Sequence, residues 1–385
     1  MMALTPRERV LAALHHEEPD RVPIILGASN ATTMKMAPYR SLKGILGIQA
    51  DDRYLYDWPE LGSAALDEAT LRRLHSDVRG VHDRFPAHIY NLNQNRPPGS
   101  PFIDDWGIGR LEIQPGVWFP GVHPLANVTD PAALQAHSWP DMDDPTRVAH
   151  VHQQAESLAI ENQYAIFAVP WLLFPLERAM DLQGMECFLQ NIALHRDFAQ
   201  EFLQKIANLC KKLMGNFLHQ LGENVDIIKI GDDLGMQDRL LISPRMYRDL
   251  LKPIHADYIA NIKAHTKAKV FFHTDGDVFD LLDDFVEIGI DILNPIQTSA
   301  GKMADLAAMK SRYGKKLCFC GAIDTQSILS RGTPAQVRQE VHRVIELLAP
   351  GGGYLLAAVH TITADVPAEN ILAMVDAAQE FGHYP

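Results

Sequence analysis

The sequence lacks the features that define several large classes of protein. It has four cysteines in 385 residues, too few for a disulfide framework, and in a chain of this length we expect them to stay reduced. No apolar run reaches the roughly 20 residues that a membrane-spanning helix needs. The first residues, MMALTPRERV, indicate the start of a helix and not a secretory leader. These absences predict a cytoplasmic protein without a membrane anchor.

The chain also lacks a surplus of cationic residues. Its 35 Lys and Arg face 48 Asp and Glu, which gives a formal net charge of -13 at pH 7. Proteins that bind nucleic acids or membrane surfaces concentrate Lys and Arg on one face, so the charge balance argues against both partners. The sequence has no G-x-S-x-G turn and no cysteine with a nearby base, which disfavours serine or cysteine hydrolysis. A small-molecule ligand or a protein partner is expected instead.

Short apolar runs alternate with helical segments along the chain. Thr5-Pro6-Arg7-Glu8 is a capping box with proline at the first helical position, and it predicts a helix that ends near His16. Buried parallel strands consist of such short apolar runs. The length fits one α/β unit, a single (β/α)8 TIM barrel over residues 1–385. The expected strands lie at 22–27, 77–81, 165–170, 226–233, 269–275, 291–297, 316–324 and 354–362.

The segment between the second and third expected strands has a different composition. Residues 83–150 are rich in Pro, Asp, Trp and His, and the stretch 106–113 resembles a small hairpin. We interpret 83–150 as an insertion in the barrel that forms a lid or a wall of the active site. The sequence contains no repeat of fixed period and no low-complexity tract, which excludes a solenoid.

Ionisable residues follow the apolar parts of three expected strands. Asp232 and Asp233 end one strand, His273 and Asp275 end the next, and His360 ends the last. In a parallel barrel the carboxyl ends of the strands meet at one face, where active sites lie. His273, Asp275 and His360 could therefore form a three-ligand metal site that keeps one position open. The structural alternative is that strand ends are polar because they meet water and that each histidine is hydrogen-bonded.

Asp232 and Asp233 also have two interpretations. Adjacent carboxylates at a strand end could act as a general base, support a metal ligand or bind substrate. Asp close to a glycine, here Gly235, is also common as a helix or turn cap, which is the structural alternative. The glycines at 351–353 precede an expected strand and do not open a helix. We interpret them as a tight turn and not as a phosphate-binding loop.

Four groups of motifs are spread over nearly the whole chain. They are Pro19-Asp20-Arg21-Val22-Pro23, Ile242-Ser243-Pro244 with Pro253, Gly289-Ile290-Asp291 with Asn294-Pro295, and Pro367-Ala368-Glu369-Asn370 with Tyr384-Pro385. As a set they resemble the uroporphyrinogen decarboxylase superfamily. The resemblance implies a (β/α)8 barrel, in agreement with the strand pattern. That superfamily contains tetrapyrrole decarboxylases and zinc-dependent methyltransferases, which exchange methyl groups between corrinoid proteins and small acceptors.

The resemblance does not extend to the substrate clamp of the decarboxylases. Those enzymes carry an arginine-rich segment after the first strand that grips substrate carboxylates. Residues 27–33 of this chain contain no arginine, and Lys35 and Arg40 are the nearest cations. One lysine does not replace paired guanidinium groups, so uroporphyrinogen is not an expected substrate. One decarboxylase feature is kept, because His360 stands at the histidine of that group's H-G-I motif.

The methyltransferase branch offers a closer correspondence. Its members bind zinc through a His-x-Cys motif and a distant cysteine. His273 matches the histidine, and Asp275 and His360 stand at the two cysteine positions. The resemblance therefore implies a divalent metal, with zinc the first expectation. The harder donors of this chain would make the metal a stronger Lewis acid toward oxygen.

Our first expectation is a metal-dependent methyltransferase that moves a methyl group between a small-molecule substrate and a corrinoid. The chain has no D-x-H-x-x-G motif, so the corrinoid should arrive on a separate partner protein, and the relatives imply a homodimer. The second expectation is a lyase, a metal-independent decarboxylase of a smaller carboxylic acid that uses His360 and an aspartate. The third is a non-catalytic ligand-binding protein on an enzyme scaffold.

Overall fold

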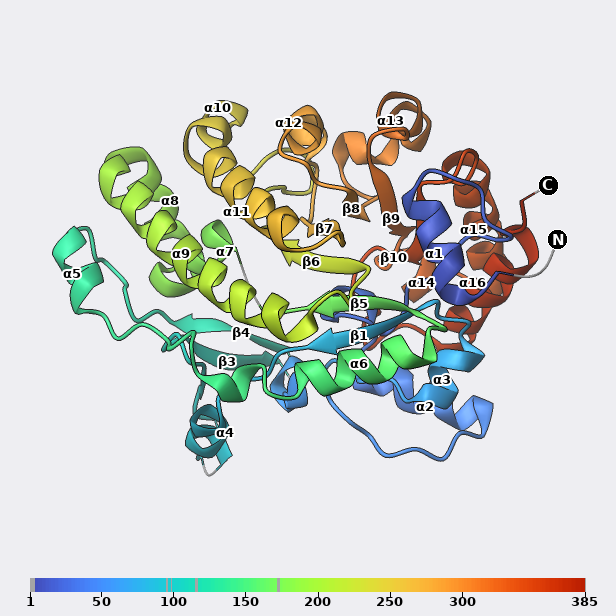
Figure 1. The fold of residues 1–385 in the computed structure, drawn as a ribbon, viewed down its shortest axis with the longest axis horizontal. Helices are drawn as coiled ribbons and strands as arrows, with labels where there is room; N and C mark the ends of the chain where they lie inside the picture. The colour runs from blue at the N-terminus through green and yellow to red at the C-terminus, as the bar shows by residue number, and fades with distance from the viewer. Residues whose placement is uncertain (1–3, 95, 98, 115–116, 172–173, 385) are drawn as a thin grey trace.

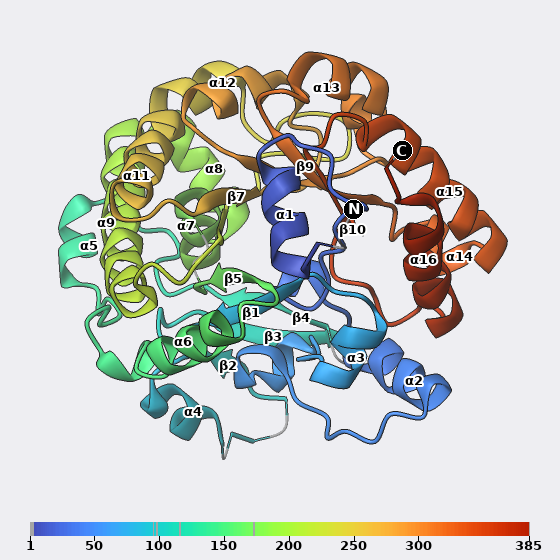
Figure 2. The same cartoon turned by 45° about the vertical axis from the view of Figure 1, so that its right-hand side comes forward.

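A computed structural model describes residues 4–94, 96–97, 99–114, 117–171 and 174–384. Seven parallel strands form one sheet in the order β1-β5-β6-β7-β8-β9-β10, and the sheet curls with helices around its outside (Figure 1, Figure 2). The strands are β1 (Val78–His82), β5 (Ala165–Val169), β6 (Ile227–Gly231), β7 (Lys269–His273), β8 (Ile292–Ile296), β9 (Cys318–Ile323) and β10 (Tyr354–Ala358).

Helices connect the strands and cover the outer face of the sheet. The first group is α1 (Pro6–Leu14), α2 (Met36–Leu46), α3 (Glu68–Arg73), α4 (Ala87–Gln94), α5 (Pro131–Ala136), α6 (Val151–Glu161), α7 (Pro175–Gln183), α8 (Met185–Leu194) and α9 (Arg196–Leu221). The second is α10 (Pro244–Met246), α11 (Lys252–His265), α12 (Leu282–Glu287), α13 (Leu306–Tyr313), α14 (Ile328–Arg331), α15 (Pro334–Leu348) and α16 (Ala368–Phe381).

The strands bury both of their faces, because side chains alternate along a strand. On β6 and β7, Ile227 and Phe271 belong to the cluster of apolar side chains inside the curl. Their neighbours Ile228 and Phe272 belong to the larger cluster between the sheet and the helices. This two-sided burial explains why the strands are apolar runs in the sequence.

Helix α1 covers the amino-terminal ends of the strands. Its residues Val10 and Ala13 belong to the inner cluster. Gly353 N, directly before β10, donates to Ala13 O at 3.0 Å, and Arg7 N donates to Gln163 O at 2.9 Å, two residues before β5. One end of the curled sheet is therefore closed by a helix, and the site must lie at the carboxyl ends.

The segment that we expected as the first strand, 22–27, joins the two edges of the sheet but is not an extended strand. Its single parallel bridge pairs Ile24 with Leu356 of β10. Leu356 N donates to Pro23 O at 2.9 Å on one side, and Asp77 N donates to Ile24 O at 2.9 Å on the other. Pro23 has no N–H to donate, which prevents a continuous ladder here.

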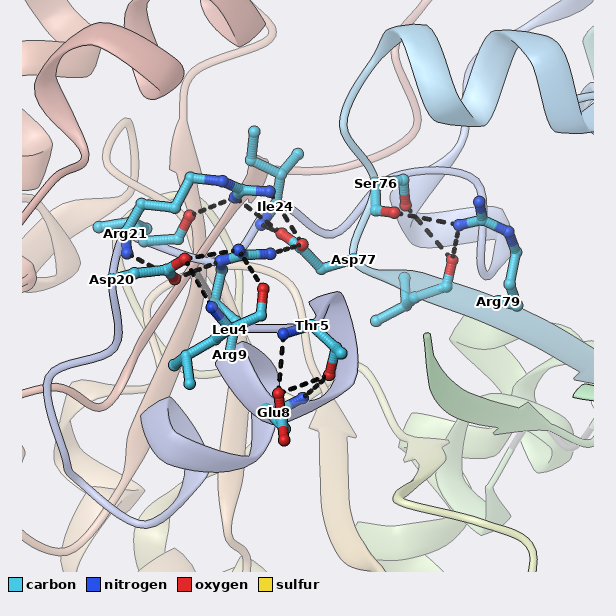
Figure 3. Close-up of polar contacts among 12 residues, drawn as sticks. Leu4, Thr5, Glu8, Arg9, Asp20, Arg21, Ile24, Ser76, Asp77 and Arg79 are labelled. Carbon is cyan, nitrogen blue, oxygen red and sulfur yellow. Dashed lines mark hydrogen bonds and ion pairs between the residues drawn. The ribbon is translucent and has the colours of Figure 1, made fainter. Parts of the chain in front are cut away.

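A buried carboxylate fastens this segment to β1 (Figure 3). Asp77 is fully buried directly before β1. It accepts hydrogen bonds from Arg9 Nη1 of α1 at 2.6 Å, from Arg21 Nη1 at 2.9 Å and from Ile24 N at 2.8 Å. The donors come from α1, from Arg21 directly before the joining segment and from Ile24 within it, so one side chain ties α1 and this segment to the start of the sheet.

The part of the chain between β1 and α5 forms a second, antiparallel sheet. Its order is β2-β3-β4, with β2 (Phe102–Ile103), β3 (Gly109–Gln114) and β4 (Val117–Val122). The predicted stretch 106–113 covers only part of a hairpin, because it contains the end of the turn between β2 and β3 and most of β3, which pairs with β2 on one side and β4 on the other. Trp106 lies in a turn because its N–H and that of Ile108 both donate to the Asp104 carboxylate at 3.0 Å.

The α/β class and the parallel sheet are confirmed, and the weakest predicted strand, 77–81, corresponds to β1. The capping box is present as well, with the Thr5 side chain accepting from Glu8 N. Among the described residues, no helix combines the length and apolarity that crossing a membrane requires.

We expect Asp77→Ala to lower the free energy of unfolding by about 3–5 kcal/mol, because it leaves the buried Arg21 guanidinium without a carboxylate and takes one of two carboxylates from Arg9, which keeps Asp20. Urea denaturation measures the change. Asp280→Ala is the control, since Asp280 is 53% exposed in its pair with Lys302 and its loss should cost less than about 1 kcal/mol. Equal effects of the two substitutions would contradict the role of Asp77.

Candidate metal centre

Three predicted ligands meet at the carboxyl ends of the strands. His273 is the last residue of β7, Asp275 follows it by two positions, and His360 follows β10. One ligand atom of each lies within 4.8 Å of the others. Asp275 Oδ2 is 3.7 Å from His360 Nε2 and 4.0 Å from His273 Nε2. The three side chains are close enough to share one ion.

The hydrogen bonds of His273 leave one ring nitrogen available as a ligand. His273 Nδ1 lies 2.7 Å from Asn294 Oδ1. The Asn294 amide nitrogen donates to Cys320 O at 3.3 Å, which directs its oxygen toward the histidine. His273 therefore donates from Nδ1 and keeps the lone pair on Nε2, the atom nearest to Asp275. A second ring nitrogen held by a hydrogen bond is the usual support of a metal-binding histidine.

The electrostatics of the site keep both histidines neutral. Burial, together with the charge of Lys229, lowers the pKa of His273 well below its ordinary value. The same two causes lower the pKa of His360 to about 4. Neutral imidazole is the form that binds a metal. Asp275 shifts in the other direction, because burial and the nearby Asp233 raise its pKa to about 8.

The adjacent aspartates Asp232 and Asp233 have different surroundings. Asp232 is fully buried, and its carboxylate accepts from Leu176 N at 3.2 Å and Glu177 N at 2.8 Å in the first turn of α7. It also lies 3.1 Å from His255 Nε2. The Asp232 carboxylate therefore caps the first turn of α7, in line with the structural alternative of the sequence analysis.

Asp233 faces the candidate centre. Its Oδ1 accepts a hydrogen bond from Asp275 N at 3.0 Å. Burial raises the pKa of Asp233, and the neighbouring Asp232 adds to the rise. Of the two aspartates, Asp233 is the candidate for proton transfer or for supporting a metal ligand.

Two further charged residues near the centre were missed by the sequence analysis. Glu177 lies in the first turn of α7, where burial and the charge of Asp233 raise its pKa well above its ordinary value. Lys229 lies in the middle of β6. Lys229 could have been found from the sequence, because it is a charged residue inside the apolar run 226–233. Nothing in the local sequence marks Glu177.

Comparison with known proteins places the chain in a family. A profile described as Uroporphyrinogen decarboxylase (URO-D) matches residues 123–381. The chain belongs to this family. Together with the α/β fold, the match makes the protein an enzyme of the uroporphyrinogen decarboxylase superfamily.

Curated relatives and a solved structure agree with this placement. The uroporphyrinogen decarboxylase of Legionella pneumophila (strain Corby) is 26% identical over 194 residues, 50% of this chain and 51% of that protein. That of Actinobacillus succinogenes is 35% identical over 77 residues, 20% of this chain and 21% of that protein. The match with the Legionella protein thus spans about half of its length.

The solved structure is described as a methyltransferase from Methanosarcina mazei. It superposes with a TM-score of 0.68 over 98% of this chain and 99% of that chain, at 20% sequence identity. The likeness shows a shared fold that extends over nearly the full length of both proteins.

We expect Asp232→Ala to lower the free energy of unfolding by about 2–4 kcal/mol, because Leu176 N, Glu177 N and His255 lose a buried acceptor. Asp233→Ala should cost less than about 1 kcal/mol, since it removes one of several crowded carboxylates. Chemical denaturation of both variants is the measurement. A larger loss of stability in Asp233→Ala would reverse the two assignments.

Proposed function

We propose that this enzyme is a metal-dependent methyltransferase that moves a methyl group between a small-molecule substrate and a corrinoid protein. The observation that carries the proposal is the convergence of His273, Asp275 and His360 within 4.8 Å. These residues stand at the ligand positions of the zinc-dependent methyltransferases that the sequence resembles. The fold shared with a methyltransferase from Methanosarcina mazei is consistent with the proposal.

His273, Asp275 and His360 would hold a divalent ion, zinc in the first place. Three protein ligands would leave one position for substrate, and the bound ion would act as a Lewis acid toward an oxygen that carries the methyl group. Asn294 orients His273 through its 2.7 Å hydrogen bond. Asp233, bound to the Asp275 amide, is placed to take or hold the proton of the substrate.

The charge of the site disfavours a substrate with many carboxylates. Burial raises the pKa of Glu177, Asp233 and Asp275, and repulsion by the charge of Asp233 adds to the rise at Glu177 and Asp275. Further carboxylates from a substrate would add to that repulsion. The ammonium of Lys35 is already bound to Leu61 O at 2.6 Å. These features support a small substrate and not uroporphyrinogen.

The second candidate is a metal-independent decarboxylase of a smaller carboxylic acid. The curated relatives carry a decarboxylase name, and His360 with Asp233 could exchange a proton during loss of carbon dioxide. Decarboxylation would continue after thorough chelation and in His273→Ala. Methyl transfer through the proposed centre would not.

The wider arrangement that we propose follows the same reasoning. Segment 22–27 would complete an eight-stranded barrel as one domain over residues 1–385, and residues 83–150 would form the lid or wall of its mouth. The corrinoid would be carried by a separate partner protein that docks at the mouth. Homodimer formation and a cytoplasmic location complete the proposal.

Metal content and methyl transfer together test the activity. We expect about one divalent ion per chain in protein purified without chelators. The zinc-loaded protein should form methylcobalamin from free cob(I)alamin and one of a panel of methylated alcohols, ethers, amines and thioethers, followed by absorbance. His273→Ala should lose both properties. Absence of a bound metal would end the methyltransferase proposal, and a chelation-resistant decarboxylation would establish the second candidate.

Asp275 is the sharpest test of the ligand set. We expect Asp275→Ala to lower metal affinity by at least about 10- to 100-fold, with the melting temperature nearly unchanged. The reason is that its side chain is 35% exposed and is crowded by Asp233, so its removal costs little packing. Asp275→Cys should shift selectivity toward zinc over harder ions.

Competition titrations with a chelating dye give the metal affinity of each variant, and calorimetry gives the melting temperature. Asp238→Ala is the matched control, because Asp238 is 70% exposed and, among the residues that the structure describes, pairs only with its neighbour Arg239. Normal metal content together with a lowered melting temperature in Asp275→Ala would make Asp275 a structural turn residue instead.

A further inference from the structure

Lys229 is a lysine inside the curled sheet. It is the third residue of β6, between Ile228 and Ile230, which pack outward against the helices. Ile227, two positions earlier, belongs to the inner cluster. Because side chains alternate along a strand, Lys229 projects into the interior of the curl. Its side chain is partly exposed, although all other residues of β6 are buried.

The register of the sheet places Lys229 just below the candidate metal centre. Lys229 pairs with Phe271 of β7, and Gly231 pairs with His273. Lys229 therefore lies one pleat closer to the barrel floor than His273. Phe271, its register partner, contacts Phe167 edge to face at 5.0 Å between ring centroids, and Phe167 pairs with Ile227, one pleat lower than Lys229. The ammonium thus stands between an apolar floor and the polar mouth.

The ammonium of Lys229 makes no hydrogen bond and no ion pair with any residue that the structure describes. Several other lysines of this protein have such partners. Lys252 contacts Asp284 at 2.8 Å and Glu287 at 2.7 Å. Lys35, near the same mouth, donates to Leu61 O. A partly buried ammonium with three unused donors is costly unless a further group binds it.

The positive charge of Lys229 nevertheless has an electrostatic effect on each ionisable group of the candidate centre named here. It acts on the carboxylates of Asp233 and Asp275 and on the rings of His273 and His360. A lysine that served only to neutralise these carboxylates would form a direct ion pair with one of them, as Lys252 does elsewhere. The carboxylates instead stay beyond pairing distance, which leaves the donors to a ligand that enters from the mouth.

We propose that Lys229 binds an oxyanion of the substrate and thereby makes the substrate a small monoanion, a methylated carboxylic acid in the simplest case. The anionic end would contact Lys229, and the methyl-bearing end would point up toward His273, Asp275 and His360. The substrate assignment rests on the methyl transfer proposed above. The anion site itself is a separate claim, which needs neither the metal nor the corrinoid.

Because the site has one lysine among several carboxylates, it should bind ligands that carry a single negative charge. A single oxyanion gains the charge-assisted hydrogen bond to Lys229. A second or third carboxylate on the same small molecule would face Glu177, Asp233 or Asp275. The pocket should therefore select monoanions over both neutral molecules and polyanions.

Calorimetric titration of the metal-free protein tests the anion site directly. The probes are methoxyacetate, its neutral counterpart 2-methoxyethanol, and citrate as a small polyanion. We expect methoxyacetate to bind at least about tenfold more tightly than either of the others, the effect of one hydrogen bond to a charged group. Lys229→Met should remove that preference, and Lys229→Arg should retain part of it.

The controls separate charge at this position from charge elsewhere. Lys302→Met removes an exposed lysine, 58% accessible, and should leave the preference unchanged. Thermal melting verifies that each variant is folded, and Lys229→Gln is a second neutral replacement. Equal binding of the three probes, absence of binding, or a preference that survives in both neutral variants would overturn the proposal. If the purified protein holds no metal but still prefers methoxyacetate, the methyltransferase proposal is wrong and the anion site is confirmed.

Discussion

Asp77 lies where the two edges of the curled sheet meet, and its carboxylate is bound at once by Arg9, Arg21 and the Ile24 amide. The segment around Ile24 contributes one bridge to β10, so the backbone ladder alone holds this edge weakly. Buried charge-assisted hydrogen bonds are stronger than neutral ones. The curl of the sheet is therefore secured by side chains at the point where its backbone pairing is shortest.

The candidate centre depends on that curl. His273 and His360 follow β7 and β10, which are separated in the sheet by β8 and β9. In a flat sheet, three strand spacings would hold them roughly 14 Å apart. Their rings are instead 5.2 Å apart between centroids, because both strand ends point into the interior of a curved surface. The curvature of the sheet therefore also brings the site residues together.

Strand periodicity and strand-end polarity could be read from the sequence because both are local patterns. They locate β5 to β10 and single out His273, Asp275 and His360. The distinction between Asp232 and Asp233 could not be read, because it depends on α7, which arrives from more than fifty residues away to meet Asp232. Glu177 was missed for the same reason. Lys229 differs, because a charged residue within an apolar strand is visible in the sequence. Only the structure shows to which face of the sheet its side chain projects.

Desolvation acts on all the ionisable groups of the mouth, and its consequences differ by group. It favours the neutral forms of His273 and His360, and these forms bind metals. It also disfavours the charged form of Asp275, although the charged form is the better metal ligand. Carboxylates crowded in this way favour the arrival of a cation. The ammonium of Lys229, one pleat lower, favours an anion. The two preferences are separated along the interior of the curled sheet, so a metal nearer the mouth and an anionic substrate group one pleat lower could be bound together without competing for the same contacts.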